Sequence, residues 1–232
     1  MTDLKNDILD AALAHVAFDG WSDATLIAAA GDVGADMAAV RAVFPRGAVD
    51  LAMAFHRRGD AAMLAQLAAD DLDAMKIREK ITHAVRLRLE VMADQKEEVR
   101  RGTTLFSLPV HAADGARALW ETADAIWTAI GDISEDHNWY TKRMTLSAVY
   151  SATVLFWLGD GSEGHTATWA FLDRRIEDVM QVEKLKARMR DSKLLGPLMA
   201  GPNWLLSRMK APAKMAPDDM PGHWGGQGRD AP

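Results

Sequence analysis

The stretch ILDAALAHVAFDGWSDATLIAAAGDVGADMAAVRAVFPRGAVDLAMAF, residues 8–55, decides the fold. Its first apolar residues recur at helical spacing up to Gly20, and Ser22 stands where an N-cap would begin a second short helix that ends near Gly31. A third short helix ends before Pro45, because the residue before a proline disfavours the helical conformation. Short helices joined by a glycine-containing turn predict a helix-turn-helix fold.

The rest of the chain has longer helical patterns, and no stretch alternates apolar and polar residues as a half-buried strand would. The patterns cover residues 47–67, 60–72, 75–93, 95–106, 112–131, 141–159 and 166–181. The fold class predicted from the sequence is therefore all-α.

Composition excludes several chemistries. The 232 residues include no Cys, so disulfides, thiolate nucleophiles and Cys-ligated zinc are excluded. The formal net charge is −6, and the acidic N-terminal stretch lacks the basic and apolar regions of a signal peptide. No window is apolar enough for a membrane span. These features predict a soluble, mostly helical protein.

The sequence contains no convincing catalytic or cofactor-binding motif. GDGSEG at 159–164 fits a dinucleotide-binding pattern by letters, but it follows a helix and its acids would repel phosphates. None of the seven His residues has a carboxylate three positions earlier, as a di-iron bundle requires. We therefore expect no metal, no cofactor and no enzymatic activity.

Residues 8–55 resemble the DNA-binding domain of TetR-type repressors, including the segment FPRGAVDL. A repressor must neutralise phosphates and read bases from its third helix. Here residues 1–59 carry five Lys or Arg against eight Asp, and the start of the third helix offers Asp36, Met37 and Ala39. The resemblance implies a TetR-like fold, whereas the charges predict no binding to nucleic acid.

The stretch SEDHNWYTKR, residues 134–143, places two aromatic residues among charges at a corner between helices. Aromatic residues beside Arg are typical of interface hot spots, so Trp139 and Tyr140 can be partner contacts. The alternative is that Trp139 packs into the core ahead of the next helix.

The C-terminal part is basic. Residues 183–214 carry eight Lys or Arg against Glu183 and Asp191, and residues 194–211 add apolar residues and a Trp. This pattern is typical of an amphipathic helix that lies in a membrane interface. The alternative is a helix that docks on its own domain or on a second subunit.

Residues 136–180 resemble the signature region of the COQ nine family of ubiquinone-biosynthesis accessory proteins. The resemblance rests on the run Asn138 to Arg143, on Tyr150, and on the T-W-x-F-L-x-x-R motif from Thr168 to Arg175. It implies a non-catalytic homodimer with a TetR-like fold that holds an isoprenoid lipid or ubiquinone intermediate and presents it to a di-iron hydroxylase.

Site residues follow from this resemblance and from the patterns above. The expected contacts with the hydroxylase are Asp136, Asn138, Trp139, Tyr140 and Arg143. The expected membrane contacts are Leu198, Trp204, Leu205, Leu206, Met209 and Lys210. The expected pocket residues are Leu105, Trp120, Trp127, Val149 and Phe156.

The predicted organisation has five segments. These are a helix-turn-helix-like subdomain (1–58), a helical lipid-binding and dimerisation core (59–182), a basic linker (183–193), an amphipathic membrane-contacting helix (194–211) and a disordered tail (212–232). Without a transit peptide, we expect a bacterial cytoplasmic protein at the inner face of the cytoplasmic membrane. A TetR-type ligand-responsive transcription regulator is the alternative function.

Overall fold

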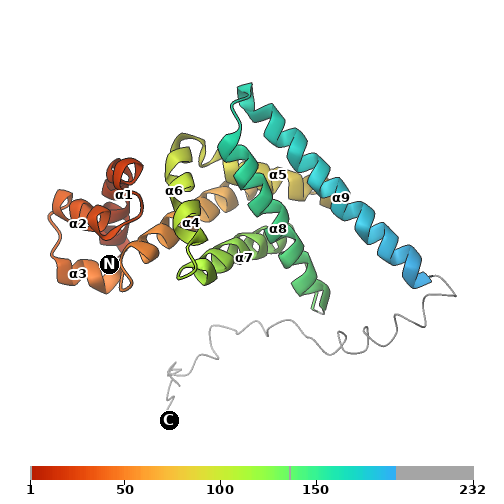
Figure 1. Ribbon diagram of the computed structural model, residues 1–232. Helices are drawn as coiled ribbons and strands as arrows, with labels where there is room; N and C mark the ends of the chain where they lie inside the picture. Colours follow the sequence, from red (N-terminus) through yellow and green to blue (C-terminus); the bar gives the residue numbers. More distant parts are fainter. Residues whose placement is uncertain (1, 136, 192–232) are drawn as a thin grey trace, which may run out of the picture.

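The computed structural model describes residues 2–135 and 137–191, and within these ranges the chain forms nine α-helices and two short 3-10 helices without any strand (Figure 1). The prediction of an all-α fold is confirmed. The first three helices form one end of the molecule, and the last two form a long hairpin at the other end. The membrane contacts predicted from Leu198 to Lys210 lie outside the described residues.

The N-terminal end consists of α1 (Thr2–Asp19), α2 (Asp23–Asp32) and α3 (Met37–Val43). Ser22 caps α2 as predicted, because its Oγ accepts a hydrogen bond of 3.2 Å from the backbone N–H of Thr25. Gly20 ends α1 with a φ of +66°, a conformation that favours glycine. The three helices are held together by fully buried apolar side chains such as Ile8, Val16 and Phe44.

The next helix, α4 (Ala48–Leu67), crosses the predicted domain boundary at residue 58. The overlapping patterns at 47–67 and 60–72 belong to this one helix, which ends at Leu67. The helix continues through Gly59 and Asp60 because the Asp60 carboxylate has a partner on the neighbouring helix, described below. The N-terminal subdomain and the core therefore share α4.

Two of the remaining α-helices pack directly against α4, and the others pack on those two. The remaining helices are α5 (Ile77–Glu90), η1 (Ala93–Gln95), α6 (Lys96–Ser107), α7 (Ala112–Ala129), α8 (His137–Gly159), η2 (Glu163–His165) and α9 (Thr166–Asp191). The predicted corner at 134–143 includes the start of α8, so Trp139 and Tyr140 lie in its first turn. Helix α9 also continues through most of the segment 183–193, whose backbone is helical as far as Asp191.

The α4–α5 contact has no room for an extra methyl group. A Cβ added at Gly59 would lie 2.6 Å from Nη1 of Arg88 and 2.7 Å from its Cζ. The guanidinium is only 3% exposed and cannot move aside without losing its hydrogen bonds. Glycine at this position therefore sets the distance between the two helices.

We predict that Gly59→Ala lowers the free energy of unfolding by about 1–3 kcal/mol, the usual cost of overpacking a core. Gly31→Ala is the matched control, because Gly31 lies in α2 with nothing within 4 Å of an added Cβ. Alanine should stabilise that helix by about 0.5–1 kcal/mol. Urea unfolding of both variants measures the difference, and equal effects would contradict the close approach at Gly59.

Candidate ligand cavity and aromatic corner

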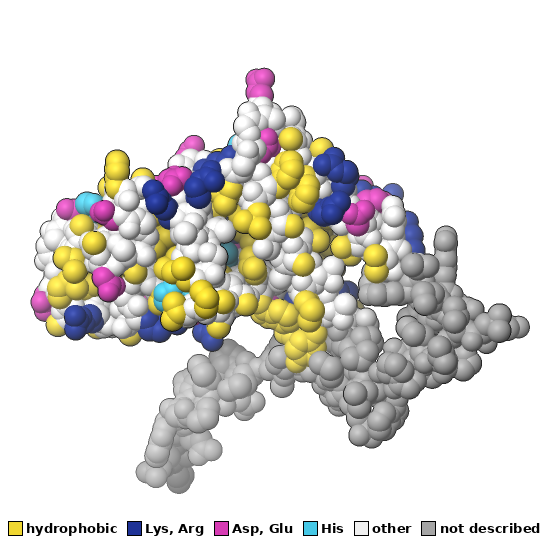
Figure 2. Space-filling model, viewed as in Figure 1, with side chains coloured by type: hydrophobic (Ala, Val, Ile, Leu, Met, Phe, Trp, Pro, Cys, Tyr) yellow, Lys and Arg dark blue, Asp and Glu magenta, His cyan; other side chains and the backbone are white. Residues whose placement is uncertain are grey.

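A cavity of about 450 Å³ lies among α4, α5, α6, α7 and α8. Figure 2 shows apolar side chains between α6 and α8 on the face where these helices are seen. The walls are mostly apolar, and their larger members are Phe55, Leu89, Met92, Phe106, Leu119, Val154, Leu155 and Trp157. The volume falls in the range of roughly 300–1,000 Å³ that is common for small-molecule sites.

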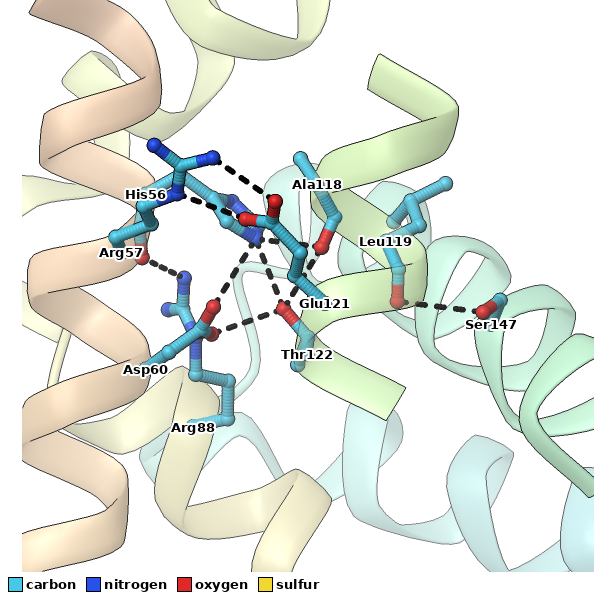
Figure 3. A network of polar contacts seen from close by, with 9 residues as sticks. All are labelled: His56, Arg57, Asp60, Arg88, Ala118, Leu119, Glu121, Thr122 and Ser147. Carbon is cyan, nitrogen blue, oxygen red and sulfur yellow. Dashed lines mark hydrogen bonds and ion pairs between the residues drawn. The ribbon is translucent and has the colours of Figure 1, made fainter. Parts of the chain in front are cut away.

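One wall of this cavity carries a connected polar network (Figure 3). Nε of Arg88 on α5 donates to the Asp60 carboxylate on α4 at 2.7 Å, and Nη2 of Arg88 donates to the backbone oxygen of His56 at 3.0 Å. The Thr122 hydroxyl on α7 donates to Asp60 at 2.8 Å. Nε2 of His56 lies 3.1 Å from the Ala118 carbonyl and 2.8 Å from the Thr122 hydroxyl. The network joins three helices.

The network holds one cation and one anion but no net charge. Burial lowers the pKa of His56 to about 4, and the positive charge of Arg88 adds to this effect, so the imidazole is neutral at pH 7. Burial also raises the pKa of Tyr150 to about 12, so the phenol stays protonated. Arg88 remains charged, and Asp60 compensates that charge at close range.

The second notable feature is a cluster of three aromatic residues where α7 meets the start of α8. Trp139 and Tyr140 have ring centroids 4.8 Å apart, and Trp120 lies 5.6 Å from Trp139 and 6.2 Å from Tyr140. All three side chains are half-buried. The Arg143 guanidinium lies 4.0 Å from the centroid of the Trp139 ring, which positions that ring by a cation–π contact.

A buried carboxylate anchors this aromatic corner. Asp132, whose side chain is 3% exposed, accepts hydrogen bonds from Lys142 at 2.7 Å, from the Ser134 hydroxyl at 2.8 Å and from Arg143 at 3.1 Å. Burial acts to raise the pKa of Asp132, but the hydrogen bonds from Lys142, Ser134 and Arg143 outweigh it and lower the pKa to about 2. The corner is therefore a folded element with a fixed shape.

Comparison with known proteins finds a match for the segment that carries the aromatic corner and two of the five helices around the cavity. Residues 112–183, which include α7, α8 and most of α9, match the family model described as COQ9. "Ubiquinone biosynthesis protein COQ9, mitochondrial" of Drosophila melanogaster is 31% identical over 186 residues, which cover 78% of this chain and 57% of that protein. The chain is therefore similar to COQ9 proteins over most of its own length.

The human protein of the same name is 28% identical over 186 residues, which cover 77% of this chain and 58% of the human protein. A probable COQ9 protein of Dictyostelium discoideum is 27% identical over 79% of this chain and 62% of that protein. The chain thus spans less than two thirds of the length of these curated relatives.

A solved structure confirms the predicted TetR-like fold. The TetR transcriptional regulator from Nitrosomonas europaea superposes with a TM-score of 0.61 at 22% sequence identity, covering 75% of this chain and 96% of that chain. At this identity the likeness concerns the fold alone.

The structure places the predicted contact residues as follows. Trp139 and Tyr140 lie together in the aromatic corner, and Asn138 is exposed beside them. Asp136 lies outside the described residues. The prediction that Arg143 contacts a partner is corrected. Arg143 is only 2% exposed and is paired with Asp124 and Asp132, so it supports the corner from inside and cannot face a partner.

The predicted pocket residues do not line the large cavity. Trp127 and Val149 line a smaller cavity of about 210 Å³ among α5, α8 and α9, and Leu105, Trp120 and Phe156 line neither. Trp120 belongs to the aromatic corner, and Phe156 stacks on Phe171 at 4.5 Å. The polar wall was not predicted from the sequence. One signal for it was present, because His56 and Asp60 stand one turn apart in an apolar helix.

Neither a metal-binding cluster nor a membrane-spanning helix is found among residues 2–135 and 137–191. In these ranges, no group of three or more His, Asp or Glu side chains is arranged to hold a metal ion. No helix within the same ranges is both long and apolar enough to cross a membrane.

We predict that the free energy of unfolding decreases as pH falls through the range between the unfolded and folded pKa values of His56. Its folded pKa of about 4 lies below its ordinary value of 6.5, so the unfolded chain binds a proton more readily between these values. Neutral His56 makes its full contribution to the free energy of unfolding above pH 6.5. This contribution is lost as pH falls to about 4, and the loss is roughly 3 kcal/mol at most. Urea unfolding between about pH 7 and about pH 4.5 measures it.

His56→Gln should flatten this dependence, because glutamine cannot take up a proton. His111→Gln, at a half-buried histidine that does not line the cavity, is the matched control. Identical slopes for His56→Gln and the wild type would mean that His56 is not held neutral by the network.

Proposed function

We propose that this protein is a non-catalytic, lipid-binding accessory protein of ubiquinone biosynthesis. It holds a prenylated quinone intermediate in the large cavity and presents it to a hydroxylase of the di-iron demethoxyubiquinone type. The observation that carries the proposal is the apolar cavity of about 450 Å³, whose walls include α7 and α8 from the segment that matches the COQ9 family. The relatives named as ubiquinone biosynthesis proteins supply the pathway.

The cavity suits a ligand that is mostly hydrocarbon. Its apolar walls favour burial of a prenyl chain at roughly 25 cal/mol per Å² of apolar surface. The rim is also apolar, since Leu108 is 47% exposed, Val110 is 77% exposed and Leu155 is 57% exposed. A tail longer than the cavity can therefore leave along this rim without first crossing a strongly charged surface.

The aromatic corner supports the docking of a partner. Half-buried Trp and Tyr side chains held in a fixed geometry lose little conformational entropy on binding, and such residues dominate interface energies. Helix α7 connects the two features, because Leu119 lines the cavity and its neighbour Trp120 belongs to the corner. A hydroxylase docked at the corner would lie against the same helix that forms one cavity wall.

Two further elements of the proposal rest on the sequence. Homodimerisation through the helical core and membrane contact by residues 194–211 stay predictions, as does a position at the inner face of a bacterial membrane. Sedimentation with anionic liposomes, with and without residues 194–232, would test the membrane contact.

A ligand-responsive transcription regulator has weaker support. The likeness to a TetR regulator concerns the fold, while α3 begins after Asp36 and has Arg41 as its basic residue. A helix that reads DNA needs positive charge to neutralise phosphates. Salt-dependent binding to DNA upstream of its own gene would favour this alternative.

We predict that Ser151→Phe lowers the amount of lipid that co-purifies with the protein. Ser151 on α8 lines the cavity, so a phenyl ring there occupies space that the ligand would fill. Ala148→Phe is the matched control, because Ala148 is exposed on the same helix and does not line the cavity. Mass spectrometry of lipids extracted after gentle purification gives the amounts.

The expected result is loss of most prenylated lipid in Ser151→Phe and wild-type amounts in Ala148→Phe. If the wild-type protein carries no isoprenoid or prenylated quinone, the proposed cavity function is wrong. Equal retention by both variants would place the lipid elsewhere.

We predict that Trp139→Ala weakens binding to the pathway hydroxylase by at least about 30-fold, the size typical of a hot-spot residue. The same change removes two aromatic contacts and should cost only about 1–3 kcal/mol of stability. Pull-down and calorimetry measure the two effects. Phe18→Ala is the control, since Phe18 is 83% exposed on α1, away from the corner. Unchanged hydroxylase binding by Trp139→Ala would remove the corner from the interface.

A further inference from the structure

The Tyr150 side chain lines the cavity, and its hydroxyl has no protein partner among the described residues. Tyr150 on α8 is 3% exposed and lines the large cavity, and its hydroxyl makes no hydrogen bond within the described part of the chain. A buried hydroxyl left unpaired costs about 1–3 kcal/mol, so such groups normally have a partner. The open space beside this hydroxyl is the cavity itself.

His56 offers a second unpaired group on the same wall. A carbonyl oxygen can only accept a hydrogen bond, so Nε2 of the neutral ring, 3.1 Å from the Ala118 carbonyl, must carry the proton. Nδ1 then has a free lone pair, and no group of the described chain donates to it. The cavity wall thus presents a hydroxyl that can donate and a nitrogen that can accept.

Arg88 connects these two side chains and fixes the charge of the wall. Its Nη2 lies 3.0 Å from the His56 backbone oxygen, and its Cζ lies 5.9 Å from the centroid of the Tyr150 ring. Its positive charge is already matched by Asp60 at 2.7 Å. An anionic ligand would lose its hydration in an apolar cavity without a free countercharge, which is strongly unfavourable. The wall therefore suits a neutral ligand.

We propose that Tyr150 and His56 bind the hydroxyl group of a neutral phenolic ring, which accepts a hydrogen bond from the Tyr150 hydroxyl and donates one to Nδ1 of His56. The ligand class is a prenylated phenol or quinol without a ring carboxylate. This inference rests on the proposed lipid-binding function and adds the head group that the cavity selects. Thr122 and Asp60 hold the His56 ring in place, and they are positioning residues (Figure 3).

Four probes with the same farnesyl tail test the inference on the full chain by equilibrium dialysis. They are farnesylphenol, its methyl ether, farnesylbenzene and a farnesylbenzoic acid. The wild type should bind the phenol about 5-fold to 50-fold more tightly than farnesylbenzene, as expected for one or two net hydrogen bonds. The methyl ether can accept but cannot donate, so it should fall between them. The carboxylate should bind at least about 10-fold more weakly than the phenol.

Tyr150→Phe separates ligand recognition from a structural role. The variant should bind farnesylbenzene as the wild type does and should lose the preference for the methyl ether over farnesylbenzene. Its melting temperature should be unchanged or higher, because a hydroxyl that makes no internal hydrogen bond is removed. A lowered melting temperature with the wild-type ligand preference intact would overturn the assignment of Tyr150.

The remaining outcomes are also decisive. Equal wild-type affinity for the phenol and farnesylbenzene would overturn the inference while leaving the lipid-binding function in place. Binding of the carboxylate as tightly as the phenol would overturn the assignment to a neutral ligand. Failure of all four probes, the hydrocarbon included, would overturn the proposed function together with this inference.

Discussion

The ion pair between Arg88 and Asp60 is the contact on which the cavity depends. Both side chains are almost fully buried, and removing either would leave an unpaired charge in an apolar interior, a change that commonly costs about 3–5 kcal/mol. The pair survives burial because each member has further hydrogen bonds, from Thr122 to the carboxylate and from the guanidinium to the His56 carbonyl. The Arg88–Asp60 pair therefore holds α4 against α5 and α7, and the cavity lies beside the pair. An apolar replacement could stabilise the core equally well, but it would remove the polar wall.

The aromatic corner, where α7 meets the start of α8, uses the same physical device. Arg143 is as buried as Arg88 and is matched by Asp132, whose carboxylate also binds Lys142 and Ser134. Here the pair fixes the first turns of α8, so that Trp139 packs on the guanidinium instead of moving freely. The cavity and the aromatic corner are thus each shaped by a buried arginine. In each case the charge is hidden, and the groups that it positions face the cavity or the surface.

The helices can be read from the sequence, whereas the wall of a cavity cannot, for a physical reason. Helix spacing and caps such as Ser22 are local, so they can be read from neighbouring residues. A cavity is a gap left by five helices whose contacts are remote in sequence, and its wall residues look like any other core residues. Trp127 and Val149 were apolar and helical, as expected for a pocket, but they line a different space. Arg143 was predicted to be exposed because its partners, Asp124 and Asp132, lie 19 and 11 residues away.

The contacts between α7 and α8 limit how a ligand can leave the cavity. Ser147 on α8 donates to the Leu119 carbonyl at 3.2 Å, and the Trp127 indole donates to the Lys142 carbonyl at the same distance. These bonds, together with Arg143, join the two helices along most of their length, so separating them would expose several buried polar groups at once. The turn between α6 and α7 has exposed Leu108 and Val110 instead, and such a turn opens at lower cost. A partner docked on Trp139 would therefore leave the α7–α8 wall intact, and the ligand would pass out beside α6.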